Sequence, residues 1–248
     1  MKAIILAGGY GTRLYPLTIN APKPMLAVGG KPMIQYLIEK LEKITQISGI
    51  IIVSNEKFSH IFAEWLWENP QYKNIVLLND GTTSNEDRLW PVGDIRFVIE
   101  NAAINEDVMI LWGDNLIEDD FTDLVKNFEE KWNILWLYDV GDLEYAKQMS
   151  NPTLDDTWRI IDFVEKPSNP TSTLIGTLIY VIKNQSLKYV EDVIRDGKAD
   201  RAGDFIAYLS QKEPVFGYTL KWKWFDIGTI EQLKKAEDWI ILERTKKI

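Results

Sequence analysis

The feature that most constrains the fold is a repeated alternation of short apolar runs with amphipathic helical patterns. The runs of strand length are 2–7, 50–54, 75–78, 108–112, 134–140, 159–164 and 174–182. The helical patterns are 31–44, 56–67, 119–131, 186–195, 204–211 and 230–244. Strands joined through helices pair in parallel and are buried on both faces. The order therefore predicts an α/β fold with a single Rossmann-like, doubly wound, mainly parallel sheet.

Length and composition agree with one globular core. The chain has 248 residues, of which 46% are hydrophobic and 26% are charged, and it contains no internal repeat. Trp65, Trp112 and Trp136 are expected in that core, and 79–86 and 151–157 are expected to be the most mobile loops. No apolar run approaches the roughly 18 residues of a membrane-spanning helix, and the N-terminus has the pattern of a strand rather than of a signal peptide.

Charge and reactive residues exclude several classes of function. The net charge of −9 argues against a nucleic-acid-binding surface or an anionic-membrane surface. The absence of cysteine excludes disulfides and thiol nucleophiles and fits a cytoplasmic protein. The single histidine, His60, cannot build a multi-histidine metal site. A small polyanion remains compatible with the chain if metal ions and a few placed cations neutralise it.

A glycine-rich loop follows the first expected strand. It contains Gly8, Gly9 and Gly11, and Arg13 lies two residues further on. Exposed backbone amides and a planar guanidinium both suit phosphate oxygens, although a simple turn would have the same pattern. It is not a Walker loop, because no Gly-Lys-Ser/Thr follows. It is also a poor dinucleotide fingerprint, because Leu14 occupies the third glycine position.

A second cation lies further along the same loop. Lys23 stands between Pro22 and Pro24, whose rings restrict the backbone on both sides. Its ammonium can therefore be held in place at a small entropic cost.

Three acidic residues lie close to later strands. Asp114 follows the strand 108–112, Glu165 precedes Lys166 after the strand 159–164, and Asp226 precedes the last helix. Because ligands of open parallel sheets bind beyond the carboxyl ends of the strands, these are candidate site residues. Carboxylates there suit hard metal ions, although helix caps and turns use the same residue types.

Together these segments resemble the sugar-phosphate nucleotidyltransferases, also called nucleotide-sugar pyrophosphorylases, whose type case is glucose-1-phosphate thymidylyltransferase. The long run from Gly8 to Thr18, followed by Pro22-Lys23-Pro24-Met25, is similar to the family signature. The later motifs occur in family order: Gly113-Asp114, Glu165-Lys166-Pro167 and Trp224-Phe225-Asp226-Ile227-Gly228-Thr229. The resemblance covers essentially the whole chain, and it implies one nucleotidyltransferase domain over 1–248 with a small sugar-binding subregion.

The resemblance also implies roles for the matching residues. Arg13 and Lys23 would hold the triphosphate, Asp114 and Asp226 would bind Mg²⁺, and Lys166 would hold the sugar 1-phosphate; these five form the expected catalytic set. The nucleotide would lie against Leu6, Ala7, Gly8, Gly9, Gly11, Thr12, Arg13, Lys23, Arg88 and Gly93. The sugar phosphate would lie against Asn115, Glu165, Lys166, Gly176 and Trp224.

Two segments depart from the family pattern. Where many members carry a glycine-rich segment that reads the nucleobase, only Gly93 matches, and Arg88 faintly resembles part of a cytidylyltransferase motif. Members tend to have Gly-x-Tyr after Glu-Lys-Pro, whereas here Leu178 precedes Ile179-Tyr180 and the nearest glycine is Gly176. The nucleobase and the sugar therefore stay open.

The resulting hypothesis is transfer of a nucleotidyl group from a nucleoside triphosphate to a sugar 1-phosphate, which gives an NDP-sugar and pyrophosphate with Mg²⁺ as cofactor. One alternative is transfer to a non-sugar phosphate such as phosphocholine. Another is a catalytically idle nucleotide-sugar-binding regulatory subunit, although an idle protein has no need for both metal ligands. The expected partners are the two small substrates, with no nucleic acid or membrane, and a homo-oligomer is compatible with the sequence.

Overall fold

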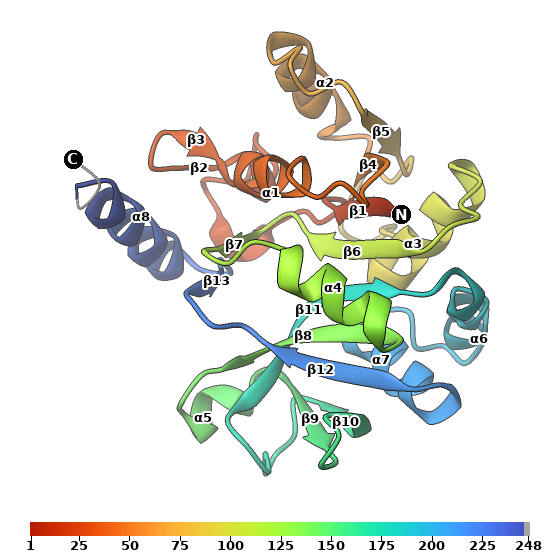
Figure 1. Ribbon diagram of the computed structural model, residues 1–248. Helices are drawn as coiled ribbons and strands as arrows, with labels where there is room; N and C mark the ends of the chain where they lie inside the picture. Colours follow the sequence, from red (N-terminus) through yellow and green to blue (C-terminus); the bar gives the residue numbers. More distant parts are fainter. Residues whose placement is uncertain (246–248) are drawn as a thin grey trace.

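The computed structural model describes residues 1–245 and is built around a seven-stranded sheet. Figure 1 shows this sheet, whose strand order is β12-β8-β11-β6-β1-β4-β5. The strands are β1 (Lys2–Leu6), β4 (Gly49–Ser54), β5 (Ile75–Asn79), β6 (Val108–Trp112), β8 (Asn133–Asp139), β11 (Leu174–Ile182) and β12 (Val215–Thr219). The expected α/β fold with a mainly parallel sheet is confirmed. The exception is β11, which is antiparallel to both of its neighbours, β6 and β8.

Helices cover both faces of the sheet. The helices are α1 (Met33–Leu41), α2 (Ser59–Glu68), α3 (Trp90–Asn101), α4 (Thr122–Glu130), α5 (Leu143–Ala146), α6 (Tyr189–Arg195), α7 (Ala202–Lys212) and α8 (Ile230–Thr245). Side chains of α1, α2 and α4 share one core cluster with Ala3 and Ile5, whereas those of α3, α6 and α7 share another with Ile4 and Leu6. Successive residues of β1 thus alternate between two apolar layers, as a doubly wound sheet requires.

Short strand pairs form separate two-stranded sheets beside the main one. They are β2 (Ala27–Val28) with β3 (Lys31–Pro32), β7 (Asn115–Ile117) with β13 (Trp224–Asp226), and β9 (Ser150–Leu154) with β10 (Ile160–Glu165), all antiparallel. Side chains of α8 pack with Val28, Met33, Leu116 and Ile227 in a third apolar cluster. Figure 1 shows α8 close to β2, β3 and β13, away from the centre of the sheet. Within residues 1–245, no helix combines the length and apolar character needed to cross a bilayer.

The structure differs from the sequence-based expectation in several elements. No helix or strand was predicted over residues 90–101, where the structure has helix α3. Pro91 lies in the first turn of this helix, where a proline costs no intrahelical hydrogen bond. The segments β7, β12, β13 and α5 were also missed, and the expected loop 151–157 is largely strand β9. Trp65 and Trp136 are buried, but Trp112 is only half-buried, because it is the last residue of β6 and its ring reaches the edge of a cavity.

A buried asparagine ties the end of β4 to the loop after β1. The Asn55 side chain is fully buried, its Nδ2 donates to the Gly8 carbonyl at 2.8 Å, and its Oδ1 accepts from the Phe58 amide at 3.0 Å. This one side chain pairs with backbone groups of the glycine-rich loop and of the segment before α2. It therefore holds the glycine-rich loop next to the end of β4.

We expect Asn55→Ala to lower the free energy of unfolding by about 1–3 kcal/mol per buried polar group left without a partner. Urea unfolding followed by circular dichroism measures this loss. The matched control is Asn101→Ala, which removes an exposed amide hydrogen bond to the Phe97 carbonyl and should change stability by about 0.5 kcal/mol or less. Equal losses in the two variants would show that Asn55 is not the anchor.

Candidate active site

A cavity of about 310 Å³ lies at the carboxyl ends of β1 and β6. Its lining includes nearly all residues expected at the nucleotide: Leu6, Ala7, Gly8, Gly9, Gly11, Thr12, Arg13, Lys23 and Arg88, together with Asp114. It also includes residues that were not expected at the nucleotide: Tyr10, Pro24, Asp80, Asn85, Trp90, Pro91, Asp94, Trp112 and Asp200. Gly93 is not part of this lining, because in α3 it packs against Leu89.

The glycine-rich loop takes a conformation that depends on Gly11. This residue has a φ of +60° immediately before a short 3-10 helix, Thr12–Leu14, a backbone region that disfavours side chains with a Cβ. A Cβ at Gly11 would lie 3.1 Å from Cγ2 of Thr18, whose hydroxyl donates to the Gly11 carbonyl at 2.7 Å. The turn directs Arg13 toward Gly228, where an added Cβ would lie 3.5 Å from the guanidinium.

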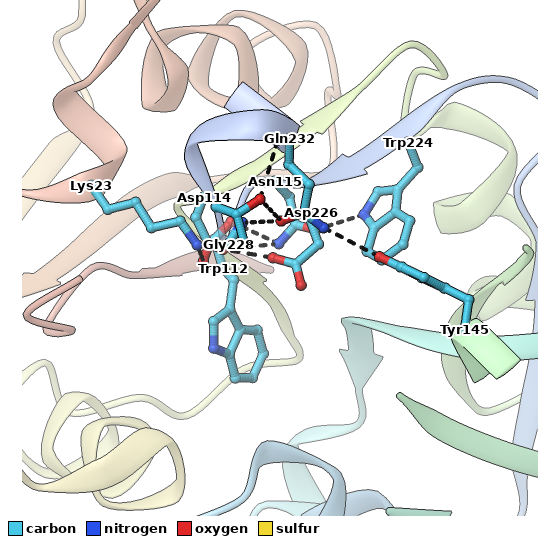
Figure 2. A network of polar contacts seen from close by, with 10 residues as sticks. Lys23, Trp112, Asp114, Asn115, Tyr145, Trp224, Asp226, Gly228 and Gln232 are labelled. Atoms are coloured by element: carbon cyan, nitrogen blue, oxygen red, sulfur yellow. Dashed lines mark hydrogen bonds and ion pairs between the residues drawn. The ribbon is translucent and has the colours of Figure 1, made fainter. Parts of the chain in front are cut away.

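Lys23 connects the two expected metal ligands (Figure 2). Its Nζ donates a hydrogen bond to Asp114 Oδ2 and lies 3.9 Å from Asp226 Oδ1. The Lys23 side chain is buried, and it belongs to a short 3-10 helix, Lys23–Met25, that begins after Pro22. The structure therefore brings Arg13, Lys23, Asp114 and Asp226 together, although they lie far apart in the sequence.

Burial raises the pKa of Asp226, and the nearby Asp114 carboxylate raises it further. Lys23 and Arg13 act in the opposite direction and favour the ionised form. The raised pKa of Asp226 follows from two acids lying close together with little access to water. In such a site, nearby positive charge stabilises the ionised forms of both carboxyl groups.

Two strands hold these acids in register. In the β7–β13 pair, Asp226 lies opposite Asn115, which directly follows Asp114. The Trp224 indole donates to Asn115 Oδ1 at 2.6 Å, and both side chains are buried. Gly113 allows the close approach of the lysine loop, because a Cβ there would lie only 2.9 Å from the ring of Pro24.

The donor set suits Mg²⁺. This ion prefers oxygen ligands and is commonly held by one or two carboxylates, with waters and substrate phosphates completing its coordination. Asp114 and Asp226 supply such a pair, and no cluster of three or more potential ligands occurs within residues 1–245. The residues present thus fit a cation shared with a phosphate rather than an all-protein metal cage.

A second cavity, of about 320 Å³, lies on the far side of Asp226. It is lined by Tyr138, Val140, Asp142, Tyr145, Trp224, Phe225, Asp226, Gln232 and Lys235. Figure 2 shows Tyr145 and Gln232 on this side of the network; the Gln232 amide donates to the Tyr145 hydroxyl at 3.3 Å. Of the residues expected at the sugar phosphate, Trp224 lines this cavity. Asn115 does not line it, but its side chain accepts the hydrogen bond from the Trp224 indole.

The remaining residues expected at the sugar phosphate lie on β10, β11 and the turn after β10. Glu165 accepts a hydrogen bond from Ser150, Lys166 is exposed with a φ of +50°, and Gly176 packs against Phe163. None of the three lines either cavity. The structure does not bring them to the Lys23 cluster.

Two acids missed from the sequence lie side by side in the first cavity. A Cβ at Gly8 would lie 2.9 Å from Asp94 Oδ2 and 3.0 Å from Asp80 Oδ2, so both carboxyl groups pack against the glycine-rich loop. Burial raises the pKa of Asp94 well above its usual range, and the adjacent Asp80 adds to the rise. Asp80 follows β5 directly, a signal that the sequence offered, whereas Asp94 belongs to the unanticipated α3.

Residues 2–241 match the model of a family described as nucleotidyl transferase. The chain belongs to this nucleotidyl transferase family. The bifunctional protein GlmU of Methanocaldococcus jannaschii is 30% identical over 253 residues, which cover 99% of this chain and 54% of that protein. A Sulfolobus acidocaldarius protein assigned as a mannose-1-phosphate guanyltransferase is 30% identical, with 92% of this chain and 60% of that protein covered. The chain spans about half the length of the curated relatives it matches.

Solved structures have the same fold as this nucleotidyl transferase chain. A Bacillus anthracis protein assigned as a glucose-1-phosphate thymidylyltransferase, solved with sucrose, superposes with a TM-score of 0.84 at 23% identity, covering 96% of this chain and 94% of that one. A UDP-glucose pyrophosphorylase solved with UDP-glucose gives a TM-score of 0.82 at 20% identity, with 98% of each chain covered. At these identities the likeness establishes the fold.

We expect Asp94→Asn to gain stability relative to the wild type as the pH rises. Above about pH 4 an unfolded aspartate ionises, whereas folded Asp94 keeps its proton until its raised pKa is reached. The free energy of unfolding of the wild type therefore falls in this window, by up to about 1.4 kcal/mol per pH unit, and asparagine removes that contribution. Urea unfolding at about pH 5 and about pH 8 measures the difference, with Glu86→Gln as an exposed control. A pH-independent difference would mean that Asp94 is not protonated in the fold.

Proposed function

We propose that this protein transfers a nucleotidyl group from a nucleoside triphosphate to a sugar 1-phosphate, releasing pyrophosphate and an NDP-sugar. The observation that carries the proposal is the cluster of Arg13, Lys23, Asp114 and Asp226 beside the glycine-rich loop. Arg13 and Lys23, together with a divalent cation that the two carboxylates would hold, supply the positive charge that a triphosphate needs. Membership of the family and the assigned activities of its relatives and structural neighbours point the same way.

In this proposal the reaction proceeds in line and without a covalent enzyme intermediate. An oxygen of the sugar 1-phosphate attacks the α-phosphorus, a new phosphorus–oxygen bond forms, and the bond to pyrophosphate breaks. Arg13 and Lys23 hold the leaving pyrophosphate and stabilise its developing charge, while backbone amides of Gly8 to Gly11 orient the nucleotide. Catalysis then consists of positioning and charge stabilisation, and it needs no side-chain nucleophile.

We further propose that Asp114 and Asp226 hold Mg²⁺, which when bound would neutralise charge on the phosphate oxygens. Lys23 lies beside both carboxylates, so Lys23 and the cation would share the same carboxylate oxygens.

We assign Lys166 to the phosphate of the sugar 1-phosphate and Glu165 to sugar hydroxyls. Because both lie outside the two cavities, this assignment requires the β9–β10 hairpin or the Lys166 side chain to move toward the substrate. We also place this activity in one catalytic domain and in the cytoplasm, where a chain without cysteine loses nothing to reduction.

The test is pyrophosphate release in the presence of Mg²⁺, with each common nucleoside triphosphate paired with a panel of sugar 1-phosphates and with phosphocholine. Release with a sugar 1-phosphate supports the proposal, and release with phosphocholine alone replaces it with the non-sugar alternative. Triphosphate binding without turnover on the panel favours a regulatory protein. Absence of both binding and turnover refutes the proposed function.

We expect Asp114→Asn to lower kcat by roughly 10²–10⁴. The substitution keeps the size of the side chain but removes the negative charge that would bind the metal ion beside the phosphates. Steady-state pyrophosphate release measures the effect, and Glu130→Gln serves as an exposed acid control. Near-normal turnover in Asp114→Asn would remove Asp114 from the metal site.

We expect Lys166→Ala to raise the KM for the sugar phosphate at least tenfold while leaving nucleotide affinity nearly unchanged, since one charge-assisted contact contributes about 1.5–3 kcal/mol. Separate titrations of the two substrates measure the two constants. Lost nucleotide affinity with intact sugar-phosphate use would reverse the assignment of the two phosphate sites.

A further inference from the structure

The Asp80–Asp94 pair lines the first cavity beside Gly8. Asp94 is 7% exposed, and its Oδ1 has no hydrogen-bond partner among residues 1–245. Both carboxyl groups pack against Gly8 and line the cavity. Two buried acids beside each other are costly, and the proposed phosphate chemistry makes no use of them.

The position of the pair fits the base rather than the triphosphate. Asp114 follows β6 and Asp80 follows β5, and β1 and β4 lie between these strands. Three strand spacings separate the ends of β6 and β5 by about 14 Å, and the Asp80 and Asp94 side chains reach from the β5 side to Gly8 in the loop after β1. The acids would repel phosphate, whereas Arg13 and Lys23 attract it. The triphosphate therefore belongs beside Arg13 and Lys23, and the nucleobase belongs beside the two acids.

We propose that the Asp80–Asp94 pair selects the nucleobase, accepting bases that carry an exocyclic amino group and rejecting uracil and thymine. This inference rests on the proposed nucleotidyl transfer and specifies which triphosphates it uses. The proton that Asp94 keeps is donated to Asp80, so it is not available to a base. The remaining carboxyl oxygens of the pair accept hydrogen bonds, and the amino groups of guanine, adenine and cytosine donate them. Uracil and thymine present two carbonyl oxygens flanking a single N–H, so their oxygens face the carboxyl oxygens. Guanine has two adjacent donors and matches a carboxylate best.

Asp80 is held in place by hydrogen bonds from its own loop. The Thr82 amide and the Thr82 hydroxyl each donate to Asp80 Oδ1 at 2.7 Å, and the Tyr10 and Thr82 hydroxyls are 3.2 Å apart. These contacts join the loop after β5 to the glycine-rich loop. A fixed set of acceptors discriminates against a wrong base more strongly than a mobile set, because the mismatch cannot relax.

A flat cationic surface lies in the same cavity. The Arg88 guanidinium lies over the Trp90 ring at 3.5 Å, and both side chains line the cavity. Trp90 has a φ of +66°, a strained backbone conformation for a non-glycine residue, of the kind that concentrates at functional sites. Planar groups of this type stack on nucleobases of any sequence, so they add affinity, and the choice among bases is left to the acids.

The test is equilibrium binding of GTP, ATP, CTP and UTP without sugar phosphate, measured by calorimetry on the wild type, Asp94→Asn, Asp80→Asn and the exposed control Glu86→Gln. Because the triphosphate is common to all four ligands, the ratio of their affinities isolates the base. We expect the wild type and the control to bind at least one amino-bearing base, GTP first, more than tenfold tighter than UTP. We expect Asp94→Asn to reduce that ratio about tenfold, since an amide can donate to a uracil carbonyl.

Each outcome bears on the inference separately from the proposed function. UTP binding as tightly as the best amino-bearing base in the wild type would overturn the inference and leave the nucleotidyl transfer standing. An unchanged ratio in both folded aspartate variants, with all affinities reduced alike, would make the pair merely structural and also overturn it. Failure of every triphosphate to bind the wild type would instead overturn the proposed function itself, and the inference with it.

Discussion

The parallel pairing of β1 with β4 on one side and β6 on the other is the constraint on which the site depends. All six residues of β4 are buried, and the other two strands are nearly as fully enclosed. Such strands present neither free backbone groups nor polar side chains to solvent along their length. Polar groups can gather only where the strands end, and parallel pairing puts those ends at one edge. The loops that carry Gly8, Asp80 and Asp114 meet there for this reason.

Gathering charges at that edge costs stability, and the arrangement around Lys23 limits the cost. The ammonium is largely buried, and so are parts of the two carboxylates it faces. Removing any one member would leave the others with unbalanced charge in a poorly hydrated place. A folded protein has little reason to keep such a cluster for stability alone, because apolar residues of similar volume would serve as well. Its retention is understandable if a multiply charged ligand completes it.

Local patterns in the sequence predict the elements whose stability is local or whose burial is complete. The central strands and most helices were found from apolar periodicity, and the glycine-rich loop and Lys23 from motifs near the N-terminus. The β7–β13 pair was not found, because three-residue strands that pair across more than 100 residues leave no periodic signal. Asp94 was not predicted for a related reason: its position beside Gly8 depends on where α3 starts relative to β1. Trp112 looked like a core residue because its strand is apolar, yet it occupies the final position, where the core ends.

The first cavity is lined by two cations, Arg13 and Lys23, and by the acid pair Asp80 and Asp94, and in the proposed function this separation of charge would orient the nucleotide. At the β6 end, Arg13 and Lys23 offset the two carboxylates, and the divalent cation proposed for those carboxylates would leave positive charge for a polyphosphate. Asp80 and Asp94, side by side against Gly8, disfavour a phosphate there. A triphosphate that entered backwards would meet repulsion at one end and leave cations unpaired at the other. Orientation then follows from charge placed by the sheet, before any base-specific hydrogen bond forms.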